Sequence, residues 1–197
     1  MLTKSVSSDI GGAPLFRRRR LSGAWCPLYL QYAIRGPIRP AAALAALDSA
    51  QIAVLETQDI AALTPAQITA LTASQVPGLT SAQLGALSTA QIVALDSADV
   101  AVIDAAAIPG LTTAQVAALT GDQFGALTST QIAAMQTADV AAFTAGHIAA
   151  LTSTQADGLT AGQLGAMTSV QFASMTTTTL ASLTTTQLAG IDALDIG

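Results

Sequence analysis

The strongest constraint on the fold is an eight-residue repeat, seen most clearly as LTPAQITA at residues 63–70. This unit (the octad) recurs from residue 47 to residue 197 without an insertion or a deletion. Position one of each octad is a large apolar residue, and position six is apolar throughout, with Ala156 as its weakest member. Because tandem copies of so short a unit bury a core only by stacking on one another, the pattern predicts a solenoid.

Positions two and five of the octad predict where helices begin. Position two is usually Thr, Ser or Asp, and position five is usually Gln, as in Thr64 and Gln67. This spacing is typical of a capping box, in which each side chain bonds the main-chain N–H of the other residue. Pro65 stands at the expected first helical residue, where its missing N–H costs nothing. We therefore expect every octad to start a new helix.

The end of the octad predicts where each helix stops. Pro77 and Pro109 would interrupt a continuing helix, and Gly78 and Gly110 follow them at position eight, where we expect a left-handed helix C-terminus. Helices of one or two turns are not stable alone and persist only by packing. The expected fold class is therefore all-α, a repeat solenoid of very short helices restarted every eight residues. A β-solenoid is the alternative, since Thr and Ile suit strands, although period-two alternation is missing.

A second period of forty residues overlies the octad. Asp replaces Gln at position five in Asp59, Asp99 and Asp139, and the octad blocks 47–86, 87–126 and 127–166 resemble one another. Duplication of a five-octad segment explains this period. A solenoid turn of five octads, which would align the aspartates, is the structural alternative. We favour duplication.

Charge divides the chain into two expected domains. All seven Lys and Arg lie in residues 1–40, while eleven of the twelve acids lie in residues 41–197. We interpret 1–40 as a basic, disordered, non-repeat leader and 41–197 as the octad solenoid. A targeting signal and a segment that contacts nucleic acid or an anionic membrane remain alternatives for the leader. The acidic array should repel nucleic acid, and the sequence has no apolar run long enough for a transmembrane helix.

The sequence offers little catalytic or metal-binding chemistry. His147 is the single histidine and Cys26 the single cysteine, so neither a metal site nor a nucleophile with a base is indicated. We interpret His147 as a substitute for Gln at a helix start. Asp96, Asp99 and Asp104 cluster in sequence and are weak calcium candidates, although capping of helices explains most of the acids. We therefore predict no enzyme, no catalytic residue and no cofactor.

The octads also resemble a known type of repeat. The segments LTTAQVAALT (111–120), LTSTQIAAM (127–135) and LTTTQLAGI (183–191) resemble the LTxxQIxA octapeptide arrays of large bacterial surface or secreted proteins. Such proteins are often labelled haem-utilisation, adhesin-like or calcium-binding. The resemblance covers residues 47–197 and implies secretion and a cell-surface or spacer role.

Two functional hypotheses follow. The first is a non-catalytic structural module, a spacer, stalk or adhesion surface of a bacterial exported protein, located outside the cell or on its surface. The alternative is a repeat module that binds calcium, glycan or an unknown protein partner. A repeat product without a selected role is a third possibility. Apolar residues at the C-terminal end of the stack suggest end-to-end self-association.

Overall fold

A computed structural model describes residues 44–191, and this part of the chain contains α-helices and two short 3₁₀-helices but no strand. The helices are α3 Ser49–Ala53, α4 Thr57–Ala61, α5 Pro65–Ile68, η1 Val76–Gly78, α6 Ser81–Ala86, α7 Thr89–Val93, α8 Ser97–Val102, η2 Ile108–Gly110, α9 Thr113–Ala117, α10 Gly121–Ala126, α11 Ser129–Ala134, α12 Thr137–Ala141, α13 Ala145–Ala150, α14 Ser153–Ala156, α15 Ala161–Leu164, α16 Ser169–Ser174, α17 Thr177–Ser182 and α18 Thr185–Leu188. The all-α repeat solenoid is confirmed, and the β-solenoid alternative finds no strand in this range. The predicted leader, residues 1–40, lies outside the described residues.

The capping box predicted from positions two and five forms at the start of most helices. In α6, the Thr80 hydroxyl oxygen accepts from the main-chain N–H of Gln83, and Oε1 of Gln83 accepts from the N–H of Thr80 at 2.9 Å. Pro65 occupies the first turn of α5, as expected. An octad with a capping box therefore satisfies its own helix N-terminus with two side chains.

The C-caps of the helices are extended residues, as in α10, or αR residues, as in α4, and not left-handed glycines. The N–H of Leu127 bonds the position-six oxygen of Phe124 at 3.2 Å, and Leu127 then turns the chain with φ −60° and ψ 135°. No glycine of residues 44–191 has a φ in the left-handed region. The expectation of a left-handed C-terminus is therefore wrong, because two extended residues, at positions one and two, make the corner.

Octads 71–78 and 103–110 contain a 3₁₀-helix in place of an α-helix. Residues 76–78 and 108–110 form the 3₁₀-helices η1 and η2, each with a proline in its centre. Proline disfavours the α conformation at the residue before it and supplies no N–H. Pro77 and Pro109 thus stop the helix, as the sequence indicated, and they tighten its last turn.

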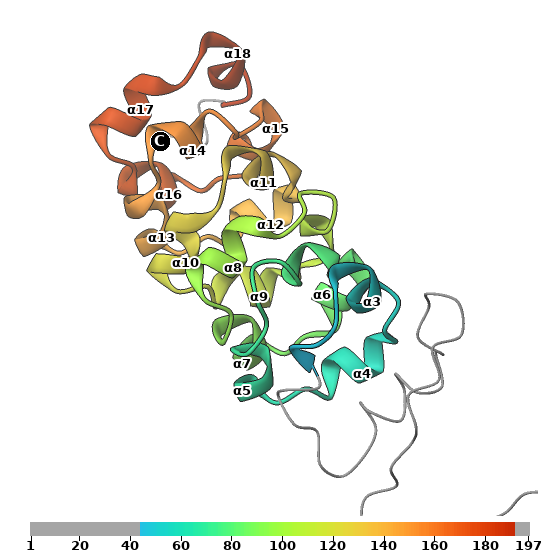
Figure 1. Ribbon diagram of the computed structural model, residues 1–197. Coiled ribbons are helices and arrows are strands. Elements are labelled where there is room, and N and C mark those ends of the chain that lie inside the picture. Colours follow the sequence, from blue (N-terminus) through green and yellow to red (C-terminus); the bar gives the residue numbers. More distant parts are fainter. Residues whose placement is uncertain (1–43, 192–197) are drawn as a thin grey trace, which may run out of the picture.

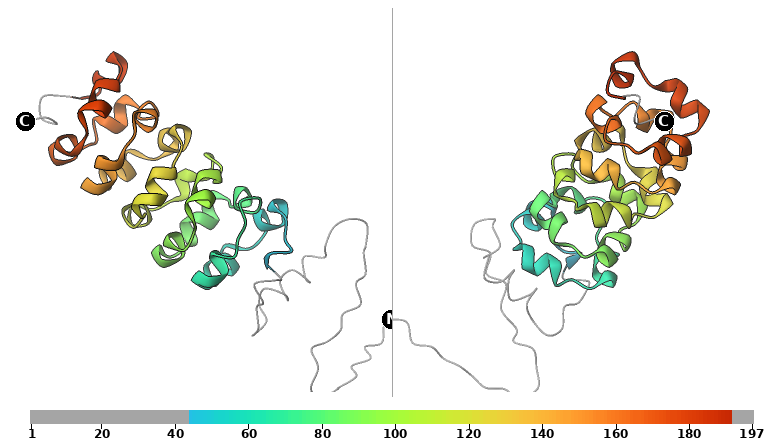
Figure 2. Two further views of the ribbon diagram at one scale, coloured as in Figure 1. Left: turned by 60° about the vertical axis from the view of Figure 1, so that its left-hand side comes forward. Right: turned by 180° about the vertical axis from the view of Figure 1, so that it is seen from behind.

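Successive turns of the solenoid (coils) stack along one axis. In Figure 1 the chain advances from the blue end to the red end, and the turned views in Figure 2 show the same elongated stack. Helix α4 packs on α6, α10 on α13, and α14 on α17, three octads later in each pair. Hydrogen bonds between coils join residues 28 and 31 positions apart. One coil therefore takes between three and four octads, and the five-octad coil considered above is wrong.

The core is a narrow column made from positions one and six. Position six is completely covered along most of the stack, as at Ile52, Leu84 and Phe124. Position one, for example Leu87 and Leu127, lies at the corners with at most a few per cent exposed. Both positions belong to one continuous apolar cluster. Within residues 44–191, no helix has the length and apolar character required to cross a membrane.

Candidate functional site

The most strongly constrained polar residue of the octad is the glutamine at position five. Its side chain is almost fully buried in the interior coils, for example at Gln83 with 1% and Gln131 with 2% exposed. Burial of a primary amide is unfavourable unless its donors and acceptor are all hydrogen-bonded. A capping box alone uses only the oxygen of the amide.

The two amide hydrogens bond the preceding coil. Nε2 of Gln131 donates to the main-chain oxygens of Val100 and Ile103, at 2.8 Å each. The same pair of bonds, to the residues 31 and 28 positions earlier, defines a glutamine ladder along the stack. Its members are Gln75, Gln83, Gln91, Gln115, Gln123, Gln131, Gln155, Gln163, Gln171 and Gln187.

The ladder satisfies groups that a short helix leaves open. The acceptors are the oxygens of positions six and one, at the C-terminus of a helix and at the corner that follows it. The corner oxygen of position one has no donor from its own helix, while the position-six oxygen also accepts the N–H three residues later, as Val100 O does from Ile103 N at 3.3 Å. One glutamine therefore caps the N-terminus of its own helix and the C-terminus of a helix one coil earlier. The sequence pattern predicted only the first of these two roles.

Thr179 and His147 replace glutamine at position five, and each supplies one hydrogen-bond donor to the preceding coil. Oγ1 of Thr179 donates to Leu151 O at 2.8 Å, and Nε2 of His147 lies 2.8 Å from Leu119 O. Nδ1 of His147 accepts from Thr144 N, which assigns the proton to Nε2. Its ring also stacks on Phe124, with centroids 4.7 Å apart. His147 is thus a buried structural residue, in the helix-start place that the sequence indicated.

Aspartate at the same position has no donor when it is ionised. Asp99 and Asp139 are each 2% exposed. Burial raises the pKa of both carboxyl groups above the ordinary value of 3.8, and at Asp99 the charge of Asp96 raises it further. A main-chain hydrogen bond opposes the rise in each case, from Asp96 and from Gln136. Oδ2 of Asp99 is buried without a hydrogen-bond partner.

Two of the predicted calcium candidates, Asp96 and Asp104, accept hydrogen bonds from main-chain N–H groups at separate places. Oδ1 of Asp96 accepts from Asp99 N at 2.7 Å, as a helix cap, and Oδ1 of Asp104 accepts from Ala106 N at 2.9 Å, in a turn. Across residues 44–191, no three His, Cys, Asp or Glu side chains form a group that could hold a metal ion. The acids Asp192 and Asp195 lie outside the described residues.

Glycine at position eight marks close contact between coils. A Cβ on Gly158 would lie 2.1 Å from the main-chain oxygen of Ser129, and one on Gly110 would lie 2.0 Å from that of Ser81. These distances are shorter than any real Cβ contact, so a larger residue would push the coils apart. The glycines are therefore required by packing, not by backbone conformation.

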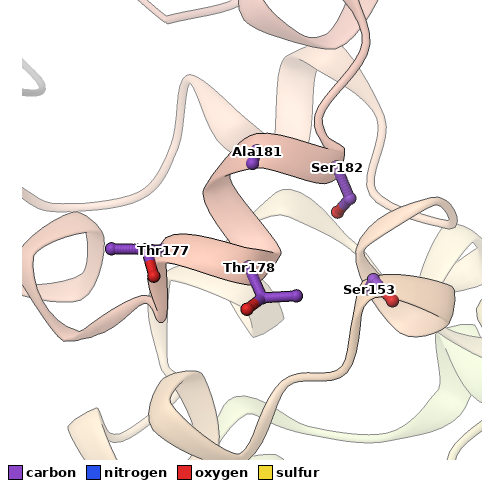
Figure 3. Close-up of a pocket in the computed structure, with 5 residues that line it drawn as sticks. All are labelled: Ser153, Thr177, Thr178, Ala181 and Ser182. Atoms are coloured by element: carbon purple, nitrogen blue, oxygen red, sulfur yellow. The ribbon is translucent and has the colours of Figure 1, made fainter.

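A shallow, open depression lies on the exposed surface of the described residues, near their C-terminal end. Ser153 of α14 and Thr177, Thr178, Ala181 and Ser182 of α17 line it (Figure 3). The Ser182 hydroxyl donates to Thr179 O at 2.8 Å and is thus engaged within its own helix. The depression combines small hydroxyl and methyl groups and carries no titratable side chain.

The repeat type is decided by comparison with known families. A family described as "ALTTAQ repeat" matches residues 52–89, 92–129 and 132–169, which together exceed half of the chain. The chain belongs to the ALTTAQ repeat family. No curated protein and no solved structure matches it.

The three ALTTAQ repeat matches begin forty residues apart, the period of five octads seen in the sequence. The hydrogen bonds of the ladder instead join residues 28 and 31 positions apart. The ALTTAQ repeat period and the solenoid coil are therefore different lengths. This difference supports duplication of a five-octad segment as the origin of the longer period, and Asp59, Asp99 and Asp139 do not form a column.

Proposed function

We propose that the octad solenoid is a non-catalytic spacer or stalk, with an adhesive outer surface, in a bacterial exported protein located outside the cell or on its surface. The observation that carries this proposal is the glutamine ladder. It ties each coil to the one before it by two hydrogen bonds at every full ladder position. Such a stack keeps a defined length, which is the property that a spacer needs.

The use of the buried polar groups argues against catalysis. In the ladder glutamines, the amide oxygen accepts from a main-chain N–H at a helix N-terminus, and both amide hydrogens are donated to main-chain oxygens. His147 is engaged through both ring nitrogens and stacked on Phe124. A general base or nucleophile must instead reach a reacting atom. The polar chemistry of these residues is directed inward, and the proposal assigns no enzymatic role.

The outer surface supports contact with a partner rather than a deep binding site. Positions three and four of the octads present small exposed residues, such as Ser97 and Ala98 on α8 or Thr177 and Thr178 on α17. Repetition of small groups at regular spacing gives a surface on which many weak contacts add together. An extended partner, rather than a small ligand, fits such a surface.

The spacer proposal is tested by shape and location together. Small-angle X-ray scattering of the full chain should give the pair-distance distribution of a rod, and antibodies against the solenoid should label intact cells of the source organism. A compact particle would overturn the spacer role. Labelling only after permeabilisation would overturn the surface location and leave the rod shape standing.

A second candidate is a ligand-binding repeat module. The hydroxyl-lined depression between α14 and α17 favours a glycan as its ligand, because sugars bond to hydroxyl groups at shallow surfaces. A glycan array with the full chain, compared with the double variant Thr178→Ala and Ser153→Ala, tests this role. Binding that the variant loses would support it; an array without signal would remove it.

A further inference from the structure

At Asp99 and Asp139, the glutamine ladder has a hydrogen-bond donor only when the carboxyl group is protonated. Ladder glutamines, His147 and Thr179 all bring an N–H or O–H to the main-chain oxygen 28 residues earlier. Asp99 and Asp139 occupy the same octad position and are equally buried. An ionised carboxylate only accepts hydrogen bonds, whereas a protonated one donates.

Thr179 shows that a short side chain reaches this acceptor. Its Oγ1, one bond beyond Cβ, lies 2.8 Å from Leu151 O. An aspartate oxygen lies two bonds beyond Cβ, so its reach is greater than that of threonine. By the register of the octads, the corresponding acceptors are Leu71 O for Asp99 and Leu111 O for Asp139.

Asp99 is arranged for a single proton. The Asp99 carboxyl group accepts a hydrogen bond from the main chain of Asp96, and its Oδ2 is buried without a hydrogen-bond partner. An unpartnered buried oxygen of a carboxylate is strongly unfavourable, while a hydroxyl in the same place can donate to a carbonyl. At Asp139, Oδ2 accepts from Gln136 N at 3.1 Å, which leaves the other oxygen for this role.

We propose that Asp99 and Asp139 are acid-strengthened ladder positions, whose protonated carboxyl groups donate to Leu71 O and Leu111 O and whose ionisation breaks these two contacts between coils. In acid the stack then has one inter-coil donor at each of these two positions, where a ladder glutamine supplies two. It is loosened there at neutral pH, while the full glutamine positions are unaffected. This inference does not depend on the spacer role.

Within the described residues, no charged group packed around Asp99 or Asp139 favours ionisation of the carboxyl group. Asp96 caps the helix of Asp99, and α10, which packs on α8, carries the exposed Asp122; η1 carries no titratable side chain. The helices packed on α12, which are α9 and α15, contain no titratable residue. The charge of Asp96 favours the neutral form of Asp99, and residues 44–191 contain no Lys or Arg that would oppose this.

The direction of the pH dependence follows from the raised pKa. A carboxyl group whose pKa is raised by folding binds its proton more tightly in the folded state. Its stabilising contribution is complete below the unfolded value, near 3.8, and is lost as pH rises through the folded value. Because other carboxyl groups of the protein also titrate in this range, variants must isolate the two positions.

The test compares full-length wild type with Asp99→Asn and Asp139→Asn from about pH 4 to about pH 8. Asparagine is nearly isosteric and donates at every pH. At neutral pH each variant should melt roughly 2–4 °C above wild type, and this gap should close in acid. Asp122→Asn, at an exposed position, is the matched control and should show no such gap. A gap that stays constant with pH would overturn the proposal.

Carboxyl carbon NMR provides a second readout that does not require a change of stability. The Asp99 and Asp139 resonances should titrate with a pKa above the ordinary value of 3.8. Midpoints at or below 3.8 would overturn the proposal even if the variants change the melting temperature. Stabilisation of wild type by added Ca²⁺, absent from Asp99→Asn, would equally overturn it, because a cation rather than a proton would then occupy the position.

Discussion

Gln123 and Leu95 lie 28 residues apart and are joined by a hydrogen bond of 2.7 Å from Nε2 to the main-chain oxygen. The second hydrogen of the same amide bonds Ile92 O at 2.8 Å, and its oxygen accepts from Thr120 N at 3.0 Å. One side chain thus connects a helix start, a helix end and a corner. This relationship explains how helices of four to six residues persist, since none of them would be stable alone.

Replacing a ladder glutamine by glutamate should be strongly destabilising. In Gln131→Glu the capping oxygen is kept, but the donors to Val100 O and Ile103 O are lost and a charge is buried beside them. We expect a loss of about 2–4 kcal/mol in the free energy of unfolding. Urea denaturation at neutral pH measures this loss.

Thr130→Glu is the matched control for that variant. Thr130 lies next to Gln131 in the first turn of α11 and is exposed. Negative charge in a first turn is favourable, so we expect a change near zero or a slight gain. Equal losses in the two variants would mean that added charge, not the lost inter-coil donors, accounts for the effect.

Adding one methyl group to Gly158 should separate two coils locally. In Gly158→Ala the new Cβ meets Ser129 O, a main-chain atom that cannot move aside. We expect a loss of about 1–3 kcal/mol in the free energy of unfolding.

Gly162→Ala separates this packing effect from the general effect of glycine on helices. No atom lies within 4 Å of a Cβ built on Gly162, which is in α15. Alanine should there stabilise the helix by roughly 0.5–1 kcal/mol. If both alanines stabilise the protein, the close approach at Gly158 is not a constraint.

Asp99→Gln should complete the ladder. The longer amide is expected to donate to Ile68 O and Leu71 O, as Gln91 donates to Ile60 O and Leu63 O. It also removes a buried carboxyl group, and we expect a gain of about 1 kcal/mol or more at neutral pH. Thermal unfolding measures the gain, with Asp122→Gln, which is exposed, as the control. A lower melting temperature than wild type would show that the site is built around aspartate.

The local structure could be predicted from the sequence because its signals lie within one octad. Thr80 and Gln83 are three residues apart, and their capping box follows from their types alone. The apolar positions one and six likewise indicated which side chains form the core. Pro77 and Pro109 marked the weakest helices, which became η1 and η2.

The relation between coils could not be predicted, because it joins residues about thirty positions apart. We attribute the forty-residue period of Asp59, Asp99 and Asp139 to duplication, and the structure contradicts the alternative of a five-octad coil. One signal was overlooked: position five carries Gln and never Glu, although a capping box accepts either. Only the amide supplies the two inter-coil donors.

The most direct test of the stacked solenoid measures which octads lie above one another. Pairs of spin labels at exposed position-four residues, 98 with 130 and 90 with 130, probe separations of four and five octads in a Cys26→Ser background. Pulsed electron paramagnetic resonance should give the shorter distance for 98 with 130, because a coil takes between three and four octads. A shorter distance for 90 with 130 would contradict the glutamine ladder and support a coil of five octads.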